Sequence, residues 1–90
     1  MALGLLSKLV GADKMDAVRN RVLSDIEAQL GGGRPSAKVH VSQDELGSRL
    51  RLDTYSNWLI SRVEEAGYHV TDFDLQPWVY RAFLTVERRR

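Results

Sequence analysis

The sequence contains no cysteine and only two histidines among its 90 residues. Without cysteine the chain forms neither a disulfide nor a thiolate metal site, and a reducing compartment is the natural reading. The two histidines, His40 and His69, lack the HxH or HxxxH spacing that brings metal ligands together. We therefore expect no metal ion and no other cofactor.

The chain also lacks an excess of charge of one sign and a long hydrophobic run. Thirteen Lys and Arg face 12 Asp and Glu, a net charge of +1 that argues against a general polyanion binder. The longest apolar stretch, residues 1–10, is about half of the roughly 20 residues that a membrane-spanning helix needs. It also lacks the basic start of a secretory signal. We expect a cytoplasmic protein, or one inside a host cell or virion if its source is viral.

Catalytic and phosphate-binding motifs are missing as well. The glycines at 31–33 follow a predicted helix and precede a predicted strand, whereas a phosphate-binding loop follows a strand and opens a helix. The acidic pair Asp44 and Glu45 suits the first turn of a helix, and Glu64 and Glu65 suit a solvated helix face. No Ser, His and Asp constellation appears. The sequence predicts a protein that is not an enzyme.

The residues that are present predict one small folded domain with an arm. A hydrophobic fraction of 43% and a charged fraction of 28% are ordinary for a globular chain. We expect an apolar arm over residues 1–11 and a single domain over 12–90, with a Gly- and Pro-rich linker at 31–36. A chain of this size buries only roughly 60–65% of its unfolded surface. Binding to a partner or to itself would therefore reinforce it.

The first half of the domain is predicted to be a long helix over 14–30. Apolar residues recur there at steps of three and four, and the glycines and Pro35 end the helix. Its apolar face consists of Met15, Val18, Val22, Ile26 and Leu30. We expect this face to pack in the core, although the Gly-rich linker leaves pairing with a second copy open.

The second half is predicted to contain a strand, two helices and a hairpin. The strand covers 38–41, and a Ser42–Glu45 capping box starts a helix over 43–50. A third helix over 55–66 starts after Asp53 or Thr54 and ends at Gly67. Its buried face is predicted to consist of Tyr55, Leu59, Val63 and Ala66.

The hairpin is predicted to pair strands over 68–73 and 78–87. On the second strand Trp78 and Tyr80 alternate with Ala82, Leu84 and Val86. The alternation favours burial of all five side chains in the core. The alternative is that Trp78 and Tyr80 are exposed and stack on nucleic-acid bases.

This order of elements resembles the winged helix-turn-helix superfamily. The resemblance rests on the segment Val39–Leu46, Leu50, the segment Thr54–Gly67 and the final hairpin, and it covers about residues 12–87. It implies an α+β fold, winged-helix-like (helix, strand, helix, helix, β-hairpin), behind an N-terminal helical arm. It also implies DNA binding by the helix over 54–66 and by the hairpin. The implied contacts are Arg49, Arg51, Thr54, Ser56, Asn57, Ser61, Arg62, Arg81 and Arg88.

Two functions are therefore open. The first is binding and assembly through protein–protein contacts and self-association into a homo-oligomer, as in a small structural or adaptor protein of a bacterium or virus. The apolar arm supports it, because Leu5, Leu6, Leu9 and Val10 would present an apolar patch. The second is DNA binding as a winged-helix protein. Contact of residues 1–10 with a membrane surface is less favoured, since Lys8 is their only charge.

Overall fold

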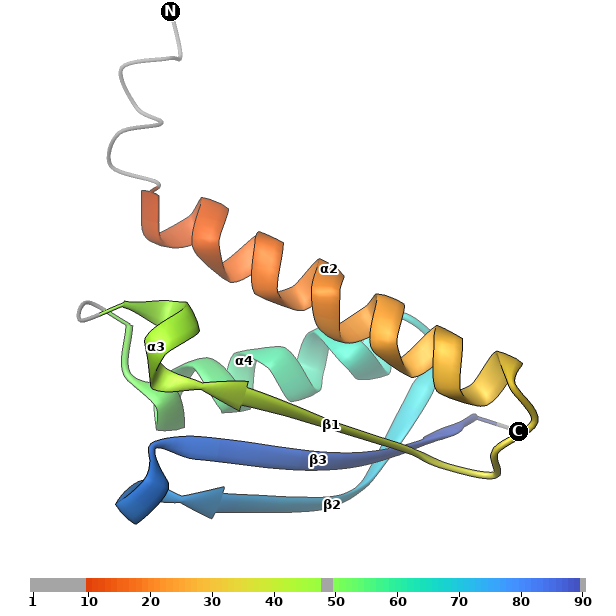
Figure 1. Ribbon diagram of the computed structural model, residues 1–90. Coiled ribbons are helices and arrows are strands. Elements are labelled where there is room, and N and C mark those ends of the chain that lie inside the picture. The colour runs from red at the N-terminus through yellow and green to blue at the C-terminus, as the bar shows by residue number, and fades with distance from the viewer. Residues whose placement is uncertain (1–9, 48–49, 90) are drawn as a thin grey trace, which may run out of the picture.

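The computed structural model describes residues 10–47 and 50–89. Its elements follow in the order α2 (Val10–Gly31), β1 (Ala37–Ser42), α3 (Gln43–Leu46), α4 (Leu52–Glu65), β2 (Tyr68–Gln76), the 3-10 turn η2 (Pro77–Val79) and β3 (Arg81–Arg88). The strands form one antiparallel sheet in the order β1–β3–β2, and α2 and α4 pack against the same face of it (Figure 1). The expected α+β class and order of elements are confirmed.

The long helix α2 packs on its own sheet. Its predicted apolar face is buried at Val18, Val22, Ile26 and Leu30. The Gln29 side chain bonds both the backbone N–H and the carbonyl of Lys38 at 2.9 Å, which fastens the helix to β1 across the linker. The apolar face of α2 is therefore buried within the chain.

The central strand β3 supplies the middle of the core. Ala82, Leu84 and Val86 are at most 1% exposed, because alternate residues of the strand face the two helices. From β1, Val39 and Val41 pair with Leu84 and Ala82 and join the same layer. On the opposite face the alternate residues are polar apart from Phe83, which lies beside His40. An antiparallel sheet with helices on one side typically has this division.

The helix α4 starts three residues earlier than predicted, and its core face is mostly as predicted. Tyr55, Leu59 and Val63 are buried, whereas Ala66, predicted to join them, is exposed beyond the last turn. Gly67 follows with a φ of +99°, the left-handed conformation that was expected to end this helix.

The break between α3 and α4 is held by one side chain. Nε2 of Gln43 donates to the carbonyls of Gly47 and Leu50 at 2.7 and 2.5 Å, and its Oε1 accepts the N–H of Leu52 at 3.1 Å. The predicted helix over 43–50 is therefore wrong in length, because Gly47, with a φ of +76°, leaves the helical conformation. The backbone N–H of Gln43 also donates to the carbonyl of Tyr80 at 2.9 Å. Gln43 thus joins the turn to the tip of the hairpin.

The hairpin differs most from its prediction. The strand β2 continues to Gln76, and the chain reverses through η2. Trp78 and Tyr80, predicted to face the core, are 72% and 67% exposed. Pro77 is the physical reason, because its fixed φ suits the first position of a 3-10 turn and it has no N–H for a strand ladder.

We expect Gln43→Ala to lower the free energy of unfolding by about 1–3 kcal/mol, since two carbonyls and one N–H lose their partner. Gln76→Ala is the matched control, because among the described residues the Gln76 side chain bonds only to the side chain of Asp74. Urea denaturation followed by tryptophan fluorescence measures both changes. Equal losses in the two variants would contradict the role assigned to Gln43.

A second prediction concerns alkaline pH. The Tyr55 hydroxyl donates to the carbonyl of Met15 at 2.6 Å, and burial raises the pKa of Tyr55 above its ordinary value of 10.0. This contribution to stability is complete below pH 10 and is lost as the pH rises above it, because the unfolded chain ionises first. Tyr55→Phe should cost about 1 kcal/mol at pH 7 and should flatten this loss. The control variant Tyr80→Phe should retain the loss of stability at high pH. Urea denaturation at pH 7 and at pH 11 compares the two variants.

Candidate functional site

Large exposed hydrophobic side chains gather at the tip of the β2–β3 hairpin. Trp78, Val79 and Tyr80 are 72%, 46% and 67% exposed, and they are the exposed large hydrophobics among the described residues. Nothing in the described fold covers them. Contiguous apolar surface of this kind marks contact sites on small proteins. We call residues 77–80 the hairpin tip.

Tyr80 ends η2 in a backbone conformation that is unusual for a residue with a side chain. Its φ of +55° and ψ of +44° are left-handed, and within residues 10–47 and 50–89 it is the one non-glycine residue with positive φ. This conformation costs an ordinary residue roughly 1–2 kcal/mol, and glycine or asparagine adopts it more readily. An exposed tyrosine recovers little of that cost through burial. Backbone bonds hold the conformation, since the Tyr80 N–H donates to the carbonyl of Pro77 at 3.1 Å and the Tyr80 carbonyl accepts the N–H of Gln43 at 2.9 Å.

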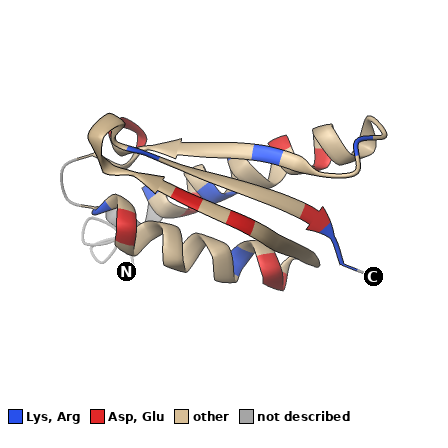
Figure 2. Ribbon diagram, turned by 90° about the horizontal axis from the view of Figure 1, so that it is seen from below, with Lys and Arg blue, Asp and Glu red and all other residues tan. Residues whose placement is uncertain are grey.

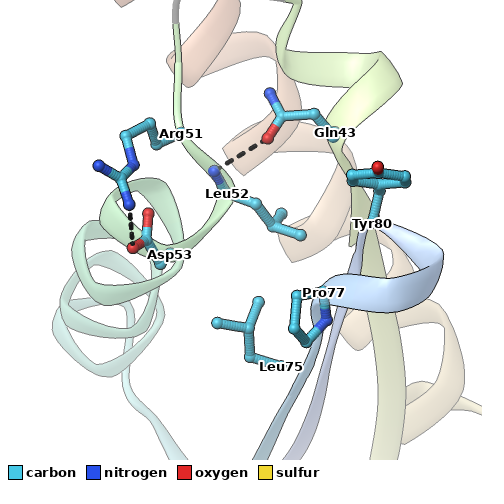
Figure 3. A pocket seen from close by; sticks show the side chains of 7 residues that line it. All are labelled: Gln43, Arg51, Leu52, Asp53, Leu75, Pro77 and Tyr80. Carbon is cyan, nitrogen blue, oxygen red and sulfur yellow. Dashed lines mark hydrogen bonds and ion pairs between the residues drawn. The ribbon is translucent and has the colours of Figure 1, made fainter.

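An apolar hollow lies between the hairpin tip and the first turn of α4. It encloses about 230 Å³, and the side chains of Leu52, Leu75 and Pro77 converge on it beside the Tyr80 ring (Figure 3). Its polar edge is the ion pair of Arg51 and Asp53, whose Nη2 and Oδ2 atoms lie 3.1 Å apart, together with Gln43. The hollow is shaped for an apolar side chain next to a polar group.

A second hollow of about 320 Å³ lies on the other side of the first turn of α4. It is lined by Met15, Leu50, Arg51, Thr54, Tyr55 and Trp58. Because Arg51 lines both hollows, they flank one turn of helix. Figure 1 shows the start of α2, α3 and η2 at this same end of the molecule, opposite the C-terminus. We call this end, with the hairpin tip and both hollows, the hairpin end.

The helix α4 carries more acidic than basic residues. The helix carries one basic residue, Arg62, and three acidic ones, Asp53, Glu64 and Glu65. Arg62 is itself paired with Glu65 at 2.6 Å. A nucleic-acid-binding surface typically has an excess of basic side chains, and α4 has no such excess.

The residues predicted to contact DNA are only partly brought together. Thr54, Asn57 and Ser61 share the solvent face of α4. Ser56 is fully buried, and its hydroxyl donates to the carbonyl of Leu52 at 2.7 Å. Its predicted contact is wrong, because Ser56 lies on the core face of the helix.

The predicted arginines are dispersed. Arg81 begins β3 on the open face of the sheet, next to Gln76, while Arg88 ends the strand and pairs with Glu27 of α2 at 3.1 Å. Seven residues of strand place their backbones roughly 23 Å apart. Arg81 and Arg88 therefore lie at opposite ends of β3.

Several predicted residues lie outside this description. Arg49 is not among the described residues, and neither are the arm leucines Leu5, Leu6 and Leu9. Only the backbone of Val10 is described, as the first residue of α2. Their predicted roles stay predictions.

A polar cluster lies at the opposite end of the molecule. The Tyr68 hydroxyl donates to Glu27 Oε2, and Arg88 donates to Glu27 Oε1 at 3.1 Å. These two bonds hold the pKa of Glu27 below its ordinary value, and the bond to Glu27 raises the pKa of Tyr68. The cluster ties α2 to the far ends of β2 and β3. We assign it a structural role.

In the part of the chain that is described, no group of three His, Asp or Glu side chains is close enough to hold a metal ion. No helix within residues 10–47 and 50–89 combines the length and apolar content needed to cross a membrane.

No family model, curated protein or solved structure matches this chain. The hairpin end combines exposed aromatic side chains, a strained tyrosine and two apolar hollows. Trp78 and Tyr80 continue the apolar alternation of the strand, so the sequence pattern predicted them to be buried, whereas both are exposed. Pro77, four residues before the start of β3, was the signal that could have revealed their exposure.

We expect Tyr80→Asn to raise the free energy of unfolding by about 0.5–1 kcal/mol, because asparagine tolerates the left-handed conformation. Val79→Asn serves as the control, since Val79 has no positive φ. Urea denaturation compares the variants. A loss above about 1 kcal/mol in Tyr80→Asn would show that the tyrosine side chain stabilises the fold itself.

Proposed function

We propose that this protein is a non-enzymatic binding module that contacts a protein partner through the hairpin end, inside the cell. The exposure of the hydrophobic residues Trp78, Val79 and Tyr80 carries this proposal. Tryptophan and tyrosine supply large contact areas, and they are enriched among the residues that dominate binding energy at protein interfaces. The hollows beside them offer space for apolar side chains of the partner.

The proposal includes self-association. Each copy of the chain offers both aromatic side chains and apolar hollows, so the hairpin tip of one copy fits the chemistry of a hollow on another. The arm leucines are a second proposed source of assembly contacts. A structural or adaptor role would use either surface.

DNA binding through α4 is the second candidate function, and the proposed relation to winged-helix proteins would accommodate it. The solvent face of α4 presents Thr54, Asn57 and Ser61, and an asparagine can pair with adenine in the major groove. Three acidic residues against one paired arginine on the helix weigh against this candidate.

A photo-crosslinking amino acid tests the main proposal. We expect p-benzoylphenylalanine at position 78 to give discrete adducts, either between copies of the purified protein or with a protein in extract of the source cells. The control position is 34, an exposed residue in the connection between α2 and β1. If the adduct joins two copies, Trp78→Ser should also lower the sedimentation coefficient at high concentration.

The proposal fails if position 78 gives no adducts beyond those at position 34. DNA binding would then be the better function if duplex DNA binds with a steep salt dependence and Asn57→Glu removes that binding. Fluorescence anisotropy of a labelled duplex measures both.

A further inference from the structure

One outer edge of the sheet is closed by side chains of α2. Gln29 bonds the N–H and the carbonyl of Lys38, and Arg21 Nη2 donates to the carbonyl of His40 at 2.7 Å. These are the backbone groups of β1 that point away from β3. A strand edge whose polar groups are already paired offers little to another chain.

The other outer edge, β2, is open along nine residues. No described segment pairs with its outer side. On β1, the backbone N–H and carbonyl of Lys38 point away from β3. The backbone groups of Thr85, which lies opposite Lys38 on β3, therefore point toward β2 and pair with those of Asp72. The alternation then directs the backbone N–H and carbonyl of Phe73 and Leu75 outward. These groups form an unoccupied template for another strand.

The apolar row on β2 is incompletely covered. Val70, Phe73 and Leu75 face the helical layer but are only half-buried. Their partners on β3, Val86, Leu84 and Ala82, are at most 1% exposed. The difference arises because β3 has a neighbouring strand on each side, whereas β2 has a neighbouring strand on one side only. One more strand alongside β2 would cover this row.

The charge along the open edge is negative. Asp72 and Asp74 project on the face of the sheet that the helices leave open. In Figure 2, β2 carries acidic residues (red) and β1 carries a basic residue (blue). On the helical side, Glu64 of α4 reaches His69 of β2, with Oε2 and Nδ1 3.5 Å apart. The edge is therefore complementary to a basic ligand.

We propose that the β2 edge binds an extended peptide segment in which Lys or Arg alternates with apolar residues, adding a fourth strand to the sheet. On the open face, its basic side chains would lie beside Asp72 and Asp74. On the helical face, its apolar side chains would lie beside Phe73 and Leu75 and extend their row. Main-chain hydrogen bonds supply affinity in this mode of recognition, and the alternate side chains supply specificity.

A second copy of β2 fits this edge poorly. Antiparallel pairing of two β2 strands would bring the Asp72 and Asp74 carboxylates of one copy close to those of the other, and like charges across strands are destabilising. The register shift at Thr71, between Val70 and Asp72, further interrupts a regular pairing with an identical strand. A basic peptide carries no carboxylates to repel Asp72 and Asp74. It also pairs with the part of β2 that follows the register shift and contains Phe73 and Leu75.

The test uses the full chain and an acetylated, fluorescein-labelled peptide Lys-Val-Lys-Val-Lys-Val. We expect this peptide to bind at least ten-fold more tightly than Lys-Lys-Lys-Val-Val-Val, which has the same charge and composition without the alternation. N-methylation of its central residues should abolish binding, because it removes the main-chain donors. Fluorescence anisotropy gives the affinities.

Charge reversal on the protein locates the site. Asp72→Lys with Asp74→Lys should weaken binding at least ten-fold, and Asp16→Lys with Asp44→Lys, an equal charge change on exposed positions of α2 and α3, should not. Amide exchange should slow at Phe73 and Leu75 when the peptide binds. Equal binding of the block peptide, or equal loss in both double variants, would overturn the edge site in favour of general charge attraction.

This inference concerns a surface other than the hairpin tip, so the two proposals fail separately. Trp78→Ser should leave the affinity for the alternating peptide unchanged. Loss of peptide binding in Trp78→Ser but not in the Asp72 and Asp74 double variant would place the peptide at the hairpin tip and overturn the edge site.

Discussion

The attachment of α2 across the outer side of β1 is the constraint on which the rest of the structure depends. Arg21 makes an ion pair with Asp25 at 2.7 Å, donates to the carbonyl of His40 at 2.7 Å, and places Nε 2.8 Å from Oε1 of Glu45. Glu45 in turn accepts the backbone N–H of Ser42 at 3.0 Å, which starts α3. One arginine thus fastens the long helix, the first strand and the next helix together. With β1 closed in this way, β2 is left as the open edge of the sheet.

The hairpin end is built by a second set of contacts that links distant segments. Gln43 holds the turn that precedes α4 with its side chain, and its backbone N–H holds the hairpin through the carbonyl of Tyr80. The strained conformation of Tyr80 is thereby anchored to the start of α3. This connection places the aromatic tip beside the apolar hollow at Leu52 and Leu75. A binding surface on such anchored elements loses little conformational freedom when a partner docks.

The two proposed surfaces differ in chemistry and so imply different ligands. The hairpin tip is aromatic and uncharged, which suits an apolar protein surface. The β2 edge has free backbone groups beside Asp72 and Asp74, which suits an extended basic segment. The two surfaces meet where β2 ends at Gln76 and the tip begins at Pro77. A single partner protein could therefore engage both, with its own extended segment along β2 and its apolar surface on the tip.

Local patterns in the sequence were sufficient for the α+β class, the order of elements, the buried face of α2 and the stop at Gly67. Periodicity, capping and left-handed glycines act over a few residues and are legible in the chain itself. The tertiary structure alone decided that Ser56 faces the core and that Trp78 and Tyr80 do not. It also decided which edge of the sheet is open, through Gln29 and Arg21. These outcomes depend on contacts between segments far apart in the chain, and the spacing of residues within one segment does not predict such contacts.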